Sequence, residues 1–118
     1  MRLVRLLLLA LLVSVSSYAM AQNPYTVRLV INGVGGGVPQ NWPGGIGVFS
    51  AVSSNWNSGT VTLEYEGPDG ITFVVAGTNA TCTANCGGVF YLPAGKIEAV
   101  LSGSPTALYA SVGQVQVP

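Results

Sequence analysis

Short stretches of alternating apolar and polar residues, each ended by glycine, proline or asparagine, constrain the fold of this chain more than any other sequence feature. Tyr25–Asn32, Thr60–Glu66 and Gly95–Leu101 alternate with a period of two, which places one set of side chains on each face of an extended strand. After residue 21, no segment shows the i, i+3, i+4, i+7 spacing of an amphipathic helix. The sequence therefore predicts an all-β domain.

The pattern predicts about seven short strands separated by turn-forming residues. They are Tyr25–Asn32, Gly47–Val52, Thr60–Glu66, Ile71–Ala76, Val89–Leu92, Gly95–Leu101 and Thr106–Val117. Strands at such spacings are typical of an antiparallel β-sandwich, jelly-roll or Ig-like, or of a small barrel, and we expect the sandwich. The apolar positions change parity near Gly113, so a β-bulge is expected there.

Two of the predicted strands form a β-hairpin. Thr60–Glu66 and Ile71–Ala76 flank Glu66-Gly67-Pro68-Asp69-Gly70, a cluster of turn-forming residues. The alternation directs Val61, Leu63 and Tyr65 into the sandwich. Glu64 and Glu66 then share the outer face.

The N-terminal residues predict a secretory signal. Arg2 and Arg5 precede the apolar run Leu6–Val13, and an A-x-A pattern ends at Ala21, so cleavage is expected between Ala21 and Gln22. Residues 22–118 then form a single β-sandwich domain. In the alternative, residues 1–21 stay attached as an apolar anchor, which is the one route by which we expect contact with a membrane.

The chain carries few charges. Without residues 1–21 it has two bases and four acids, a net charge of −2. Charged residues make up 7% of the whole chain, against about 25% in ordinary soluble domains. Nucleic-acid binding is not expected, because no basic stripe exists to neutralise phosphates. Because so few charges repel one copy from another, we expect the protein to function as part of an oligomer or a larger assembly.

The sequence contains no histidine, which excludes Ser-His and Cys-His nucleophilic pairs and the commonest metal ligand. Glu64 and Glu66 could act as paired carboxylates, but a solvated outer face is the simpler interpretation. The glycine run Gly33–Gly37 has no following Lys-Ser/Thr and opens no helix, so it is not a P-loop. We therefore expect no catalytic, cofactor-binding or metal-binding residues, and a protein that is not an enzyme.

Cys82 and Cys86 are the only cysteines. In an exported protein, two cysteines predict one disulfide, here closing a small loop at a hairpin tip. In a protein that stays in the cytoplasm they would be two free thiols.

Three aromatic residues are candidate contact residues: Trp42, Trp56 and Tyr109. Both tryptophans follow asparagine in predicted loops, where they could form a docking or sugar-binding platform. In the alternative, one tryptophan plugs the end of the sandwich and the other packs in a subunit contact. The long glycine-rich loop Gly33–Gly47 is a further candidate for binding.

The segment Gly59–Val115 resembles a small structural, decoration-type protein of tailed bacteriophages. The matching features are turns and strand ends: "GPDG" at Gly67–Gly70, "TCTANCG" at Thr81–Gly87, "FYLPAG" at Phe90–Gly95, "IEAVLSG" at Ile97–Gly103 and "PTALYA" at Pro105–Ala110. The resemblance implies β-sandwich modules that associate on virion surfaces, often as trimers, and that have no catalytic residues.

Two functions are therefore expected, in this order. The first is a non-enzymatic structural protein of a bacteriophage particle, which contacts copies of itself and other virion or cell-surface proteins. The second is a secreted bacterial binding module, carbohydrate-binding through its loop tryptophans. The corresponding locations are the virion surface and, after signal cleavage, the periplasm or the extracellular space.

Overall fold

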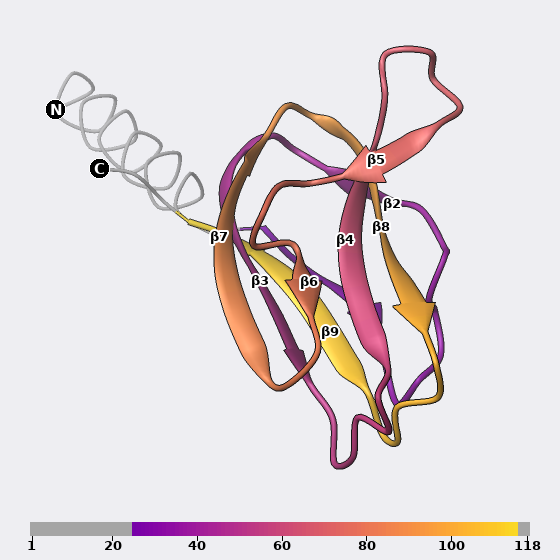
Figure 1. Ribbon diagram of the computed structural model, residues 1–118. Helices are drawn as coiled ribbons and strands as arrows, with labels where there is room; N and C mark the ends of the chain where they lie inside the picture. Colours follow the sequence, from indigo (N-terminus) through magenta and orange to yellow (C-terminus); the bar gives the residue numbers. More distant parts are fainter. Residues whose placement is uncertain (1–24, 116–118) are drawn as a thin grey trace, which may run out of the picture.

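The computed structural model describes residues 25–115, which form two antiparallel β-sheets packed face to face (Figure 1). The first sheet has the order β1 (Thr26–Val30), β9 (Tyr109–Gln114), β3 (Gly45–Val52), β7 (Cys86–Leu92). The second has the order β2 (Gln40–Trp42), β8 (Gly95–Ser102), β4 (Thr60–Glu66), β5 (Phe73–Val75), with β6 (Thr81–Cys82) also paired to β4. The prediction of an all-β sandwich is confirmed.

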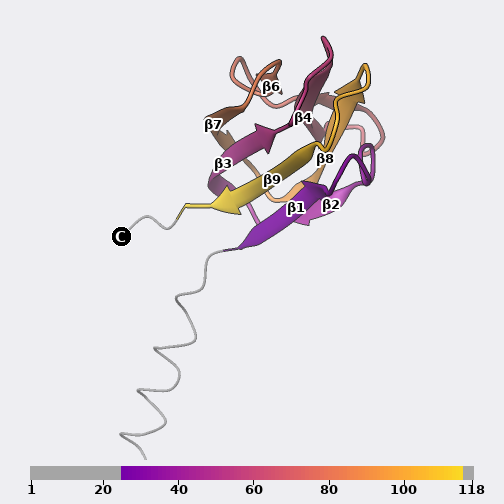
Figure 2. The ribbon, with the colours of Figure 1, turned by 90° about the horizontal axis from the view of Figure 1, so that it is seen from below.

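The chain crosses repeatedly between the two layers. Of the consecutive strands, only β4, β5 and β6 follow one another within one sheet. Figure 2 shows the layers from below, with β7, β3, β9 and β1 in one row and β4, β8 and β2 behind. Within the described residues, no helix is both long and apolar enough to span a membrane. The predicted signal and its cleavage point between Ala21 and Gln22 lie outside the described residues.

Apolar side chains fill the space between the sheets, and no polar or charged residue is fully buried in the described part of the chain. Val61 and Leu63 point inward as predicted, and Tyr65 packs against the same core while half-buried. The buried set is Leu29, Val30, Trp42, Phe49, Ala51, Val61, Leu63, Ala80, Cys82, Phe90, Leu92, Ile97, Ala99, Leu108, Ala110 and Val112. Burial of this apolar surface stabilises the stacked sheets.

The expected bulge lies in a different strand from the one predicted. The register between β1 and β9 shifts between Arg28 and Val30, so that Leu29 and Val30 are both buried. Around Gly113 the pairing of β9 with β3 runs without a shift. Val115 simply continues the alternation on the outer face, which explains the change of parity without an extra residue.

Two short strands were not predicted. β2 lies within the glycine-rich loop 33–47, where its three residues pair with β8, and β6 pairs two residues with β4. β7 begins at Cys86 rather than Val89, because Gly87 and Gly88 continue its pairing with β3. Glycines weaken a strand signal in the sequence, but here the neighbouring strand supplies the hydrogen bonds.

Candidate functional site

The outer face of the first sheet is apolar and nearly uncharged. Gly47, Phe49 and Ala51 of β3 point inward, so the alternate residues point outward. The outward apolar side chains of β3, β7 and β9, here called the apolar face, are Ile46, Val48, Val52, Val89, Tyr91 and Tyr109. Val89 is 65% and Tyr91 75% exposed.

Charge is segregated onto the opposite side of the molecule. Of the six charged residues in the described chain, Glu64, Glu66, Lys96 and Glu98 alternate with buried residues of β4 and β8, which places them on the outer face of the second sheet. Asp69 lies in the turn between β4 and β5. Arg28, on edge strand β1, is the one charge on the outer face of the first sheet.

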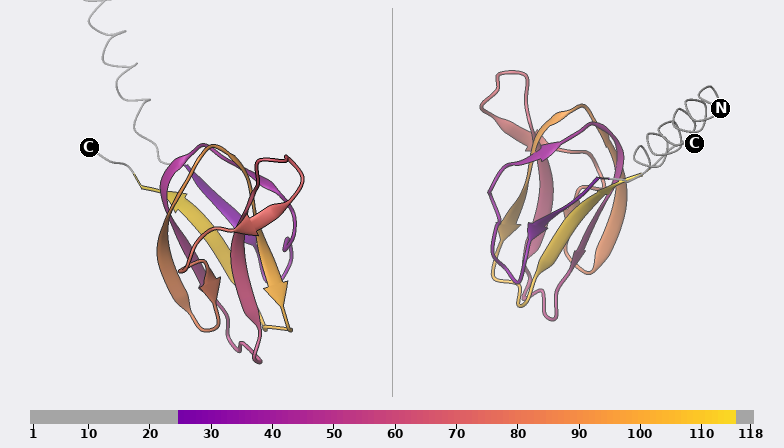
Figure 3. Two further views of the ribbon diagram at one scale, coloured as in Figure 1. Left: turned by 45° about the horizontal axis from the view of Figure 1, so that its top comes forward. Right: turned by 180° about the vertical axis from the view of Figure 1, so that it is seen from behind.

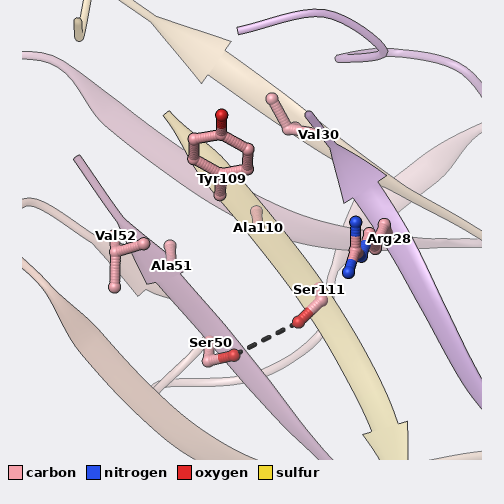
Figure 4. A pocket seen from close by; sticks show the side chains of 8 residues that line it. All are labelled: Arg28, Val30, Ser50, Ala51, Val52, Tyr109, Ala110 and Ser111. Atoms are coloured by element: carbon pink, nitrogen blue, oxygen red, sulfur yellow. Dashed lines mark hydrogen bonds between the residues drawn. The ribbon is translucent and has the colours of Figure 1, made fainter. Parts of the chain in front are cut away.

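A hollow of about 310 Å³ lies on the outer side of the first sheet. Its lining includes Arg28 from β1, Ser50 and Val52 from β3, and Tyr109 and Ser111 from β9 (Figure 4). The two serines pair directly across the strands, with their hydroxyl oxygens 3.4 Å apart. Because both serine side chains are small, they leave a depression in the outer surface beside the larger side chains of Arg28 and Tyr109. The hollow therefore presents hydroxyl, guanidinium and aromatic groups together.

Tyr109, a predicted contact residue, lies in this hollow and is 44% exposed. Sequence reasoning did not find its neighbours Arg28, Ser50 and Ser111. They come from three strands, and only the pairing of β9 between β1 and β3 brings them together. A serine at an outward position gives no distinctive signal in one sequence.

Trp42, the second predicted contact residue, lies in the core. It is only 2% exposed, and its ring lies 6.0 Å from that of Tyr25 and 5.0 Å from that of Phe90, between ring centroids. Its indole nitrogen has no hydrogen-bond partner among the described residues. This placement matches the alternative in which one tryptophan plugs the sandwich, and a surface ligand cannot reach the ring without opening the domain.

Trp56 lies half-buried at one end of the sandwich, in the loop between β3 and β4. Its indole N–H donates a hydrogen bond to Oδ1 of Asn85 at 2.9 Å, and the same oxygen accepts the backbone N–H of Ser53 at 3.0 Å. The ring is therefore anchored to the segment between the two cysteines.

Cys82 and Cys86 form the predicted disulfide, with their Cα atoms 5.8 Å apart. The prediction that this bond closes a hairpin tip is wrong, because Cys82 belongs to the second sheet and Cys86 to the first. The disulfide joins the two layers at the point where the chain crosses between them. The bond also holds Asn85 in position to accept the hydrogen bond from Trp56.

The acidic face of the second sheet brings carboxylates of β4 and β8 close together. Glu64 and Glu66 share the outer face, as predicted, and Glu64 pairs in register with Glu98 on β8. Partial burial, and then the negative charge of Glu64, raise the pKa of Glu98 above its usual range. Within residues 25–115, no group of three or more histidine, cysteine or acidic residues could hold a metal ion.

No known family matches this chain, and neither the curated proteins nor the solved structures contain a significant match.

Proposed function

We propose that this protein is a non-enzymatic structural protein of a bacteriophage particle, which decorates or joins other subunits by contact alone. The observation that carries the proposal is the segregation of charge. The first sheet presents an apolar face with one charge at its margin, whereas the second presents three carboxylates and an amine. Interface centres are depleted of charge and enriched in aromatic residues, as the apolar face is.

The extent of the apolar face also supports a contact function. Soluble monomers seldom expose large contiguous apolar patches, and such patches usually mark sites of protein interaction. Tyr91 and Val89 lie on β7, beside Ile46 and Val48 of β3, with which they pair in register. A ligand small enough to enter a pocket would leave most of this surface uncovered, so the face suits a partner protein.

We further propose that the sandwich is a jelly roll. The orders β1-β9-β3-β7 and β2-β8-β4-β5 support this, because most strands adjacent in the chain lie in different sheets while the last strands, β8 and β9, insert beside the first two. Jelly rolls occur in viral capsid proteins and in lectins. Because capsid proteins and lectins share this fold, the fold supports the structural and the carbohydrate-binding function equally. The choice between the two functions therefore depends on the charge and polarity of the outer faces of the two sheets.

Immunogold electron microscopy with an antibody against the purified chain tests the proposal. The samples are phage particles induced from the strain that carries the gene, and the envelope and medium fractions of the same culture. We expect gold on the particles, and we expect capsid or tail genes beside this gene. Gold confined to the envelope or to soluble protein in the medium would overturn the proposal.

The hollow beside Tyr109 favours a second function, carbohydrate binding by a secreted module. Sugars bind where an aromatic ring and convergent polar groups lie together, and Tyr109, Arg28 and the two serines have this arrangement. Trp42 is buried, and the indole N–H of the half-buried Trp56 already bonds to Asn85, so this hypothesis now relies on the hollow rather than on the tryptophans. Glycan-array binding that Tyr109→Ala abolishes and Tyr91→Ala preserves would support it, because Tyr91 is an exposed tyrosine outside the hollow. An array without any bound glycan would exclude it.

A further inference from the structure

The sandwich has four strand edges, and three of them carry features that prevent pairing with another chain. Edge strand β1 has a register shift and carries Arg28. Edge strand β2 has three residues, and β5 and β6 on the opposite edge have three and two. Bulges, charges and shortness are the devices by which β-proteins avoid edge-to-edge association.

Strand β7 lacks all of these features. It runs for seven residues from Cys86 to Leu92 with no charged residue and no proline, and its register with β3 shows no shift. It pairs with β3 alone. In Figure 3 (right), β7 forms the margin of the first sheet, and residues 77–80 lie against its core side next to Gly88. The disulfide at Cys86 and the ladder to β3 hold this edge in an extended form.

The pattern of hydrogen bonds identifies which β7 groups point away from the domain. Val115 donates its backbone N–H to the carbonyl of Ile46 at 2.8 Å, so the even-numbered residues of β3 bond toward β9 and the odd-numbered ones toward β7. The partners of those odd residues on β7 are even-numbered, Phe90 opposite Gly47 for example. Gly87, Val89 and Tyr91 therefore direct their backbone N–H and C=O groups outward from the sheet.

We propose that β7 pairs with β7 of a second copy, antiparallel about a twofold axis at Val89, which joins two first sheets into one. This inference names the partner of the contact function proposed above and rests on it. In this register, Val89 faces Val89 of the second copy, and Gly87 faces the second copy's Tyr91. The odd-numbered residues supply about six backbone hydrogen bonds.

The side chains on this edge are complementary to themselves. Gly87, Val89 and Tyr91 all lie on the outer face, so each tyrosine ring covers the glycine opposite it, a pairing that protects exposed glycine backbone. The edge has no charge that would repel its copy. A partner with a charged strand would leave that charge unpaired against valine and tyrosine, so a second copy suits this edge better.

The contact is smaller than a standard interface of about 1,600 Å², and we expect half-maximal dimerisation at a concentration on the order of 10–100 μM. Such a contact becomes effective when many copies lie side by side on one assembly. Because the pairing is isologous, it produces dimers. The trimers that the resemblance implies would need a different contact.

Sedimentation equilibrium of the exported chain, from about 1 μM to about 1 mM, tests the proposal. We expect Val89→Lys to weaken dimerisation at least about tenfold, because two like-charged lysines would then lie directly opposite each other across the axis, with their Cα atoms about 5.5 Å apart. Val100→Lys, an exposed valine on the outer face of β8, is the matched control and should dimerise like the unmodified chain.

Far-ultraviolet circular dichroism checks that each variant folds. An unmodified chain that stays monomeric at about 1 mM would overturn the proposal, as would a Val89→Lys chain that dimerises as well as Val100→Lys. Dimerisation weakened by Val100→Lys alone would place the contact on the second sheet and also overturn it. None of these results bears on whether gold labels the particles, so failure of the β7 contact is distinguishable from failure of the proposed function.

Discussion

The indole of Trp56 donates a hydrogen bond to Oδ1 of Asn85 at 2.9 Å, which ties the β3–β4 loop to the segment closed by the Cys82–Cys86 disulfide. This contact joins residues 29 positions apart at one end of the sandwich. It gives the indole N–H of the half-buried Trp56 a partner within the domain.

Asn85→Ala should loosen this end of the domain. The change removes the acceptor for both Trp56 and Ser53, and we expect the free energy of unfolding to fall by about 1 kcal/mol, because water replaces part of each exposed hydrogen bond. The emission of Trp56 should shift to longer wavelength, while buried Trp42 keeps its emission. Asn85→Asp keeps an acceptor oxygen and should preserve the spectrum, and an identical red shift in both variants would contradict this account.

Gly47→Ala should destabilise the core. A Cβ at this position would lie 2.6 Å from Cζ of Phe90 and 2.7 Å from Cη2 of Trp42, so the aromatic rings must shift. We expect a loss of about 1–3 kcal/mol in the free energy of unfolding, as for other overpacked cores. Gly95→Ala is the control, because its Cβ would meet nothing within 4 Å. Urea denaturation measures both, and equal stability of the two variants would show that the rings move freely.

The Glu64–Glu98 pair should make stability depend on pH. The folded chain holds the Glu98 proton more tightly than the unfolded chain, since burial and then Glu64 raise its pKa above 4.5. Between the unfolded and the folded pKa the native state binds more protons, so stability falls as pH rises through that window.

Glu98→Gln should remove this dependence and raise the free energy of unfolding at neutral pH by about 0.5 kcal/mol, the scale of a cross-strand pair of like charges. Glu66→Gln is the matched control on the same face of β4. Thermal denaturation across pH 4–8 tests this. An equal increase in the free energy of unfolding in both variants would contradict a specific role for the Glu64–Glu98 pair.

Asp69 should titrate at unusually low pH. Its carboxylate accepts hydrogen bonds from the hydroxyl of Thr72 at 2.6 Å and from the backbone N–H groups of Thr72 and Ile71, which lower its pKa to about 2. The turn between β4 and β5 projects from the body of the domain (Figure 3). The order that these bonds give the turn is present above the ordinary pKa and is lost as pH falls toward 2.

Carbon-detected NMR titration of the Asp69 carboxyl group measures this midpoint directly. Thr72→Val removes the hydroxyl, which is the largest cause of the shift, and should move the midpoint back toward 3.8, the ordinary value. A midpoint that Thr72→Val leaves unchanged would contradict this cause.

Alternation predicted most of the strands, because one buried face fixes the register of a strand such as β4. The alternation of apolar and polar residues did not predict strands in segments where glycines and prolines interrupt that alternation. β2 forms among glycines and prolines because β8 offers it a ladder, and β7 starts early because Gly87 and Gly88 pair with β3. The bulge in β1 was missed because Leu29 and Val30 are both apolar and fit either parity.

The site was less predictable than the fold. Cysteine count and predicted export sufficed for the disulfide, but a loop tryptophan in the sequence cannot be told from a core one, and Trp42 lies on β2 with its ring in the core. The apolar face and the free edge of β7 depend on which strands are neighbours. That order is a long-range property, and local patterns do not contain it.

Amide hydrogen exchange along β7, followed by NMR at low and high protein concentration, tests the central claim most directly. We expect the outward amides of Gly87, Val89 and Tyr91 to exchange more slowly as the protein concentration rises, while the exchange rate of the Phe90 amide, already bonded to β3, changes little. Exchange at all four positions that is independent of concentration would contradict it.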